Sequence, residues 1–118
     1  MPKWIFNRKG HASALDCDDA VYDKGGSFRL WIVGNNLYDR SGNHVGWVDN
    51  GVFYDNDNGV IGFTDDHTGA LPSIPGIGSI PAVPGMGARP ARPAFGGIPG
   101  RRGSGRWSDT LLEDYISE

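Results

Sequence analysis

The chain has 118 residues and a formal net charge of −3, with 19 Gly, 8 Pro and a single cysteine, Cys17. This length allows one modest domain and excludes two independent cores, while a lone cysteine excludes an internal disulfide. The acidic balance argues against nucleic acid or an anionic membrane surface as a partner. The sequence lacks the apolar run of a signal peptide and any run of about 20 apolar residues, which predicts a cytoplasmic protein that does not cross a membrane.

Aromatic residues recur at a step of 16 in the first part of the chain, each between an apolar residue and Asp or Asn. They are Phe6, Tyr22, Tyr38 and Tyr54. The third position after each Asp or Asn holds a residue type that tolerates left-handed backbone. These residues are Gly10, Gly26, Gly42 and Asn58. Each repeat therefore predicts a strand, a tight turn with a glycine bulge, a second strand and a loop.

Four such hairpins are expected to close on one another. An isolated two-stranded hairpin is marginal in water, so the four copies must share their apolar faces. Closure also leaves no open sheet edge, which an extended array would have. We therefore predict a mostly β domain over residues 1–68, with four β-hairpin repeats of 16 residues closed about a pseudo-four-fold axis.

The turn type also predicts the pairing of residues within a hairpin. In the third repeat, Tyr38 is expected to face His44, and Leu37 is expected to face Val45. Because side chains alternate along a strand, Trp47 should then share the face of Leu37.

The same reasoning applies to the fourth repeat, where it groups Phe53, Ile61 and Phe63 on one face. A glycine stands at the corresponding position of the third and fourth repeats, at Gly46 and Gly62. We expect these glycines to make room for a tyrosine ring that lies diagonally across its hairpin.

The composition changes abruptly at residue 69. Residues 69–106 contain 7 Pro, 10 Gly and five Arg, with no acidic residue, which favours an extended, polyproline-like chain. Apolar side chains are spaced through this segment as in chains that pack: Ile74, Ile77, Ile80, Val83, Met86, Phe95 and Ile98. We predict a Pro/Gly-rich basic strap or tail that lies across the hairpins of its own acidic domain or of a second copy.

The last segment, residues 107–118, predicts a short amphipathic helix. Ser108 and Asp109 are helix-capping residue types, and the apolar residues that follow have helical spacing. These apolar residues are Leu111, Leu112, Tyr115 and Ile116. The chain is thus expected to consist of a hairpin domain, a strap and a terminal helix.

The segment 37–47 carries the pattern hydrophobic-Tyr-Asp-x-x-Gly-x-x-Val-Gly, and the segment 53–63 echoes it. In this pattern the chain resembles the four-fold beta flower family, which is found in bacterial proteins. The resemblance covers roughly the first 68 residues. It implies a ring of four hairpins and no established activity.

A second resemblance concerns the segment 46–54, which is similar to the choline- or glucan-binding hairpin repeats of cell-surface proteins. The period of 16 residues departs from those repeats, which are longer. The resemblance implies binding of a quaternary ammonium group or a sugar on aromatic faces. The candidate residues for this alternative function are Tyr22, Trp31, Tyr38, Trp47 and Tyr54.

Few residues form a pattern typical of catalysis or metal binding. The four turn residues Asn7, Asp23, Asp39 and Asp55 could converge on a cation, but capping of their own turns is the simpler interpretation. The three histidines, at 11, 44 and 67, occupy different repeat positions, and none has metal-ligand spacing. Cys17 lies between Asp16 and Asp18, whose charge disfavours a thiolate. We therefore predict no catalytic residue, no metal and no cofactor.

The sequence favours a non-enzymatic structural or protein-interaction module. Its candidate partners are a second copy of the chain and another protein that binds the strap. Candidate partner-binding residues are the five arginines of the strap: Arg89, Arg92, Arg101, Arg102 and Arg106. The run 101–106 resembles RNA-associated Arg/Gly segments, but it lacks interleaved aromatic residues, so nucleic acid is not expected. The segment 90–93 offers a proline-rich ligand as a further alternative.

Overall fold

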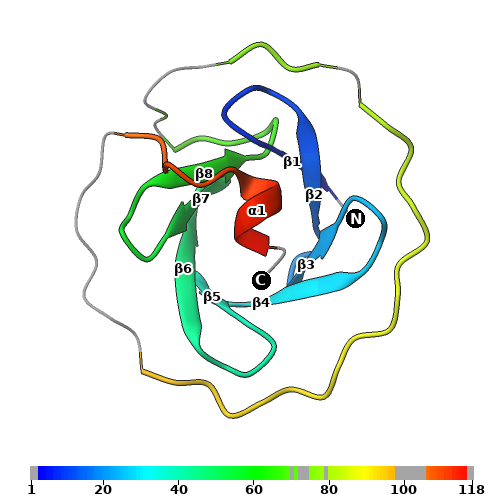
Figure 1. Ribbon diagram of the computed structural model, residues 1–118, viewed down its shortest axis with the longest axis vertical. Coiled ribbons are helices and arrows are strands. Elements are labelled where there is room, and N and C mark those ends of the chain that lie inside the picture. Colours follow the sequence, from blue (N-terminus) through cyan, green and yellow to red (C-terminus); the bar gives the residue numbers. More distant parts are fainter. Residues whose placement is uncertain (1–2, 70, 72–74, 79, 98–105, 117–118) are drawn as a thin grey trace.

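The structure is a computed structural model that describes residues 3–69, 71, 75–78, 80–97 and 106–116. Eight strands form a closed antiparallel barrel, followed by one short helix (Figure 1). The strands are β1 (Lys3–Phe6), β2 (Ala12–Asp16), β3 (Ala20–Asp23), β4 (Phe28–Val33), β5 (Asn36–Tyr38), β6 (His44–Asp49), β7 (Val52–Asp55) and β8 (Val60–Phe63), and the helix is α1 (Leu112–Ile116).

Each strand pairs with its neighbours in the sequence, and β1 closes the ring by pairing with β8 at Phe6 and Phe63. The prediction of four hairpins closed around a pseudo-four-fold axis is therefore confirmed. No helix in the described part of the chain is long and apolar enough to span a membrane.

The four hairpin turns share one geometry, as their repeated residues predict. In the third hairpin the Asp39 amide donates to the Asn43 carbonyl at 2.9 Å, and the Gly42 amide donates to the Asp39 carbonyl at 3.1 Å. Gly42 has a φ of 92°, which glycine adopts without strain. The residues with positive φ at the other three turns are Gly10, Gly26 and Asn58.

Pairing beyond the turn differs from the prediction by one residue. Leu37 pairs with Gly46, because Val45 is an extra residue at a β-bulge. One inserted residue moves the following side chains to the opposite face of the strand. The Trp47 ring therefore packs against the His44 ring, with centroids 4.8 Å apart, and the prediction that it shares the face of Leu37 was wrong.

The fourth hairpin has the same bulge, with Ile61 as the extra residue. Phe53 pairs with Gly62, and Phe53 packs with Ile61 as predicted. Phe63 lies on the other face, where its ring centroid is 5.7 Å from that of Phe6, so the prediction was wrong for this residue. Bulges increase the bend and twist of a strand, and short strands that close into a ring need both.

The two glycines next to the bulges were predicted to make room for a tyrosine ring of their own hairpin. This prediction was wrong, because other groups lie beside them. A Cβ atom on Gly46 would lie 2.1 Å from the Tyr54 carbonyl oxygen and 2.7 Å from the Tyr115 hydroxyl. A Cβ on Gly62 would lie 2.8 Å from Cγ2 of Ile5. The space therefore belongs to the adjoining strands and to the terminal helix.

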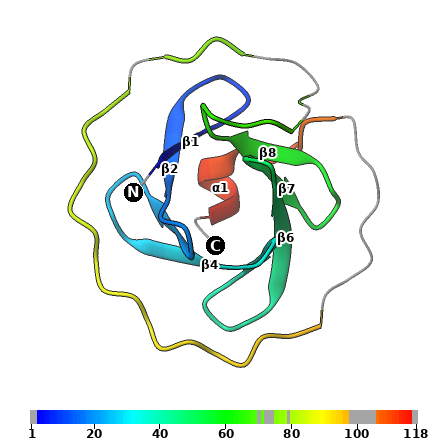
Figure 2. The same cartoon turned by 180° about the vertical axis from the view of Figure 1, so that it is seen from behind.

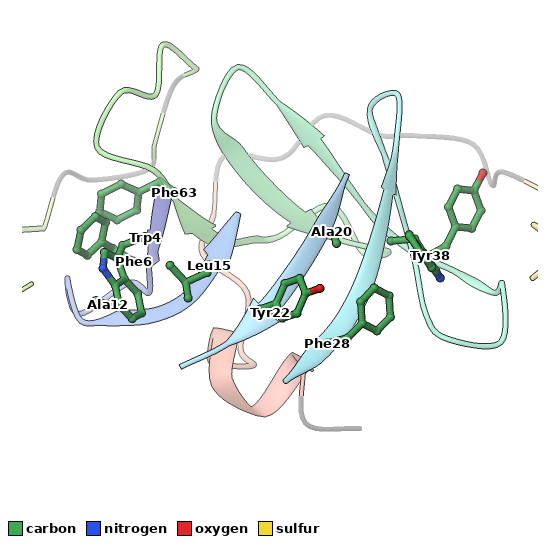
Figure 3. Packing of buried hydrophobic residues seen from close by; sticks show 10 residues of the cluster. Trp4, Phe6, Ala12, Leu15, Ala20, Tyr22, Phe28, Tyr38 and Phe63 are labelled. Atoms are coloured by element: carbon green, nitrogen blue, oxygen red, sulfur yellow. The ribbon is translucent and has the colours of Figure 1, made fainter. Parts of the chain in front are cut away.

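Buried apolar residues form two clusters, one on each face of the barrel wall. The inner cluster joins alternate strand residues to two residues of α1: Ile5, Ala14, Val21, Leu30, Ile32, Leu37, Phe53, Ile61, Leu112 and Ile116. The outer cluster is rich in aromatic residues (Figure 3): Trp4, Phe6, Ala12, Leu15, Ala20, Tyr22, Phe28, Trp31, Tyr38 and Phe63. Burial of both faces explains why the strands carry long apolar runs.

The described part of the predicted strap, residues 75–78 and 80–97, runs around the outside of the first three hairpins (Figures 1 and 2). At three turns a strap glycine amide donates to the carbonyl of the turn glycine. The pairs are Gly78 with Gly10 at 3.0 Å, Gly87 with Gly26 at 2.7 Å, and Gly96 with Gly42 at 2.8 Å. The donors advance by nine residues while the acceptors advance by 16, so a nine-residue repeat in the strap matches the hairpin repeat. Ile74 and Ile98 lie outside the described residues.

The terminal helix is confirmed but is shorter than the predicted segment. The Val60 amide donates to the Arg106 carbonyl at 3.0 Å, and the Ser108 amide donates to the Val60 carbonyl at 2.8 Å. These bonds hold residues 106–108 extended alongside β8, so the helix begins only at Leu112. Helix α1 lies at the centre of the ring in Figure 1. Its first residue, Leu112, is 1% exposed.

Candidate functional site

The turn carboxylates bind their own turns. In the third hairpin, Oδ1 of Asp39 accepts the amides of Ser41 and Asn43, both at 2.9 Å. The equivalent residues Asn7, Asp23 and Asp55 accept two amides of their turns in the same way. These contacts agree with the capping interpretation. Within the described ranges, no group of three or more His, Cys, Asp or Glu side chains could hold a metal ion.

The five aromatic residues predicted to bind a ligand belong to the barrel wall. Tyr22, Trp31, Tyr38 and Trp47 are all 4% exposed or less, and Tyr54 is half-buried. The strap contacts three of them: the Tyr22 hydroxyl donates to the Gly87 carbonyl at 3.2 Å, the Phe95 ring lies 4.5 Å from that of Tyr38, and Arg92 lies over the Trp31 ring. Ligand binding by these residues stays a prediction, and it would require the strap to move.

Two of the strap arginines, Arg89 and Arg92, contact the ring of their own chain. Arg89 pairs with Asp19, and its Nε donates to the Tyr22 hydroxyl at 3.2 Å. Arg92 lies over the Trp31 ring, 4.7 Å from its centroid, and its guanidinium is 3.8 Å from Asp19. Opposite charges therefore help to hold the strap, as its basic composition predicts. Arg106 is exposed, and Arg101 and Arg102 lie outside the described residues.

The cysteine and the three histidines have different surroundings in the part of the chain that the structure describes. Burial raises the pKa of Cys17, and the neighbouring aspartates add to this, while Arg89 opposes it. Burial thus raises the pKa of Cys17 more than the charge of the neighbouring aspartates does, although the sequence prediction of a disfavoured thiolate rested on those aspartates. His11 is exposed, His44 lies between the side-chain oxygens of two asparagines, and His67 contacts the Thr64 carbonyl. The histidines for which contacts are given therefore bond to different parts of the chain.

Two aspartates have pKa values shifted in opposite directions. Burial alone would raise the pKa of Asp23, but the amides of its turn and the Arg29 guanidinium, 2.8 Å away, outweigh burial and lower it. For Asp16 burial prevails, and its pKa is raised although the Asp18 amide donates to it at 2.9 Å.

These shifts predict opposite pH effects for Asp23→Asn and Asp16→Asn. The depressed pKa of Asp23 adds stability above the unfolded value of about 3.9, and that stability is lost as the pH falls through the folded value. Asp23→Asn should lower the free energy of unfolding at pH 7 by less than about 1 kcal/mol and weaken its decline in acid. The raised pKa of Asp16 acts in reverse, so Asp16→Asn should stabilise the protein at pH 7 and lose that advantage in acid. Urea unfolding between pH 3 and 7 measures both, and parallel pH profiles for the two variants would contradict the assignment.

In three of the four hairpins an equivalent turn residue reaches across the gap to the preceding hairpin or to the segment beside it. Arg40 donates to the Phe28 carbonyl at 3.3 Å and lies 5.9 Å from the centroid of that ring. Asn56 donates to the His44 carbonyl at 2.7 Å. Arg8 donates to the Ser108 carbonyl at 3.0 Å, next to β8. Three of the four gaps between hairpins are therefore bridged.

The gap between the first two hairpins is different. Lys24 stands where the others have Arg40, Asn56 and Arg8, and it has no polar partner among the described residues. Ala12 stands where the second hairpin has Phe28. A groove of about 480 Å³ results, lined by His11, Ala12, Ser13, Lys24, Gly78, Ile80 and Pro81. The sequence analysis did not predict this groove. A signal for it is present, because Ala12 is smaller than the residues at the equivalent positions of the other three repeats.

The strap beside this groove carries an exposed apolar stripe. Its residues are Ile77, Ile80 and Val83, which are 44%, 58% and 49% exposed. They are the large hydrophobic side chains left exposed on the part of the chain that the structure describes. Their step of three matches the three residues per turn of a polyproline-like chain, in which such side chains share one side, and we call them the apolar stripe.

Comparison with known proteins identifies the architecture. The family described as 4-fold beta flower protein matches residues 3–116, which include the hairpins, the strap and the terminal helix. No curated protein and no solved structure matches the chain. The family description names a fold and no activity, and the match confirms the resemblance seen in the hairpin repeats. The chain therefore belongs to the 4-fold beta flower family.

Proposed function

We propose that this protein is a non-enzymatic interaction module, in which the barrel is a rigid scaffold and the strap presents a contact surface. The carrying observation is the apolar stripe of Ile77, Ile80 and Val83, each at least 44% exposed. Exposed apolar stripes of this kind are typical of surfaces that bind other proteins.

The ring keeps the stripe in place. The Gly78 amide binds Gly10 at one end of the stripe, and the Gly87 amide binds Gly26 beyond the other. Between them the Trp4 indole donates to the Pro81 carbonyl at 3.1 Å. The stripe is therefore ordered before a partner binds. Binding would then cost this chain little conformational entropy.

Photo-crosslinking tests this proposal. A photoreactive amino acid at position 80, in the full chain expressed in its native cells, should yield covalent adducts with another polypeptide or with a second copy. The same amino acid at the exposed position 91 is the matched control and should yield few adducts. Adducts at position 80 should decrease several-fold when Ile77 and Val83 are replaced by serine. Absence of adducts at position 80, or equal yields at both positions, would contradict the proposal.

Small-ligand binding makes a different prediction. Trp4, Trp31 and Trp47 are at most 8% exposed, so choline or an oligosaccharide should not reach their rings. We expect the tryptophan emission of the full chain to stay constant during titration with either compound. A saturable change in emission would favour the aromatic ligand site over the interaction module.

A further inference from the structure

We propose that the groove between the first two hairpins binds an extended peptide in which an acidic residue adjoins an apolar one. This inference rests on the proposed interaction function and specifies its partner. The observation that carries it is a break in the four-fold symmetry. Lys24 has no polar partner among the described residues, and with Ala12 it lines a groove of about 480 Å³. In the next gap Arg40 is bonded to the Phe28 carbonyl, and the hollow is smaller, about 360 Å³, with the Asp39 carboxylate among its lining residues.

The hollow fits an apolar side chain. In the next gap the larger Phe28 ring stands at the position of Ala12, with Arg40 5.9 Å from its centroid, and the hollow that remains is smaller, about 360 Å³. Ala12 leaves the space of that ring open, and Ile80 and Pro81 of the strap form its outer wall. An apolar anchor from a partner would therefore take the place that Phe28 takes in the second hairpin.

The charge of the groove favours an acidic residue beside that anchor. Lys24 lines the groove together with His11, and no carboxylate is among its lining residues. The neighbouring Asp23 is already paired with Arg29, whose Nε and Nη2 donate to it at 3.0 and 2.8 Å. The ammonium of Lys24 is therefore free to bind a carboxylate of the partner.

The strap favours a partner in extended form. In the second nine-residue repeat of the strap, Arg89 and Arg92 replace Ile80 and Val83, and both fold back onto the ring. In the first repeat the isoleucine and valine remain exposed instead, alongside the groove. An extended peptide that follows the strap can contact this stripe and place its acidic residue at Lys24.

Selection from displayed random 12-residue peptides tests the inference. The full-length protein should enrich peptides in which Asp or Glu adjoins an apolar residue. The double variant Ala12→Phe/Lys24→Arg recreates the Phe28–Arg40 pair of the next gap and so narrows the groove with a combination that the fold already uses. An enriched peptide should bind this variant roughly tenfold more weakly or worse, as measured by fluorescence anisotropy.

A second variant guards against misfolding of the first. Lys24 is exposed, so Lys24→Glu should leave the fold intact and shift the selection toward Lys- or Arg-containing peptides. Enrichment of basic or uncharged peptides by the natural chain, or equal affinity for the double variant, would overturn the groove assignment. If such peptides instead lose binding when Ile77, Ile80 and Val83 are replaced by serine, the interaction function stands without the groove. No enrichment on the natural chain would count against both.

Discussion

A chain that ends at Thr68 is expected not to fold, although it contains all eight strands. Truncation removes Leu112 and Ile116, which are 1% and 3% exposed in the inner cluster. Loss of one such side chain costs roughly 2–5 kcal/mol, and a domain of this size has only about 5–15 kcal/mol in total. Truncation also uncovers the aromatic outer cluster, against which Met86, Phe95 and Trp107 pack. The combined loss should exceed the stability of the protein.

Heteronuclear NMR measures this outcome directly. The full chain should give dispersed amide signals, and the chain ending at Thr68 should give signals collapsed into the random-coil range. Leu112→Ala in the full chain is the matched intermediate, because it removes one helix contact and keeps the strap; it should lower the free energy of unfolding by about 2–4 kcal/mol. A dispersed spectrum from the truncated chain would show that the hairpin ring folds without its strap and helix.

The sequence alone predicts the parts of this fold that depend on local geometry. Each turn is fixed by an Asp or Asn cap and a residue of positive φ three positions later, such as Asp39 and Gly42. Both act within a few residues, so their spacing can be read directly. Closure of the ring follows from the number of repeats and the need to cover sheet edges.

The register could not be predicted in the same way. The extra residues Val45 and Ile61 are ordinary strand formers, and nothing local marks them as bulges. Their cause is the closure of eight short strands, which involves the whole ring. One residue of slip was enough to assign Trp47 and Phe63 to the wrong face.

The path of the strap could be predicted in part from the sequence. Prolines at 75, 84 and 93 and glycines at 78, 87 and 96 recur every nine residues, which is a repeat that composition alone conceals. The matching of these glycines to the turns was not readable, because it is made by backbone groups without side chains. The candidate ligand site could not be assessed from the sequence for the same reason. Aromatic residues predicted to bind a ligand, such as Tyr22 and Tyr38, are covered by the strap.

Replacement of Gly26 by alanine is expected to detach the strap from the second hairpin. Gly26 has a φ of 90°, and a Cβ there would lie 2.1 Å from the Gly85 carbonyl oxygen, which belongs to the backbone and cannot rotate away. The strap would have to withdraw and lose the 2.7 Å hydrogen bond from the Gly87 amide to the Gly26 carbonyl. Backbone strain, the clash and the lost bond together should lower the free energy of unfolding by at least about 3 kcal/mol.

Gly34→Ala is the matched control for Gly26→Ala. Gly34 also has a positive φ, 61°, but nothing lies within 4 Å of a Cβ at that position. Gly34→Ala should therefore cost only the strain of left-handed backbone, about 1–2 kcal/mol in urea unfolding. Hydrogen exchange separates the two effects, because the Gly87 amide should lose its protection in Gly26→Ala and keep it in Gly34→Ala. If Gly26→Ala and Gly34→Ala lower the free energy of unfolding equally and the Gly87 amide stays protected in both, backbone strain alone accounts for both variants. The strap would then not depend on close approach to the turn.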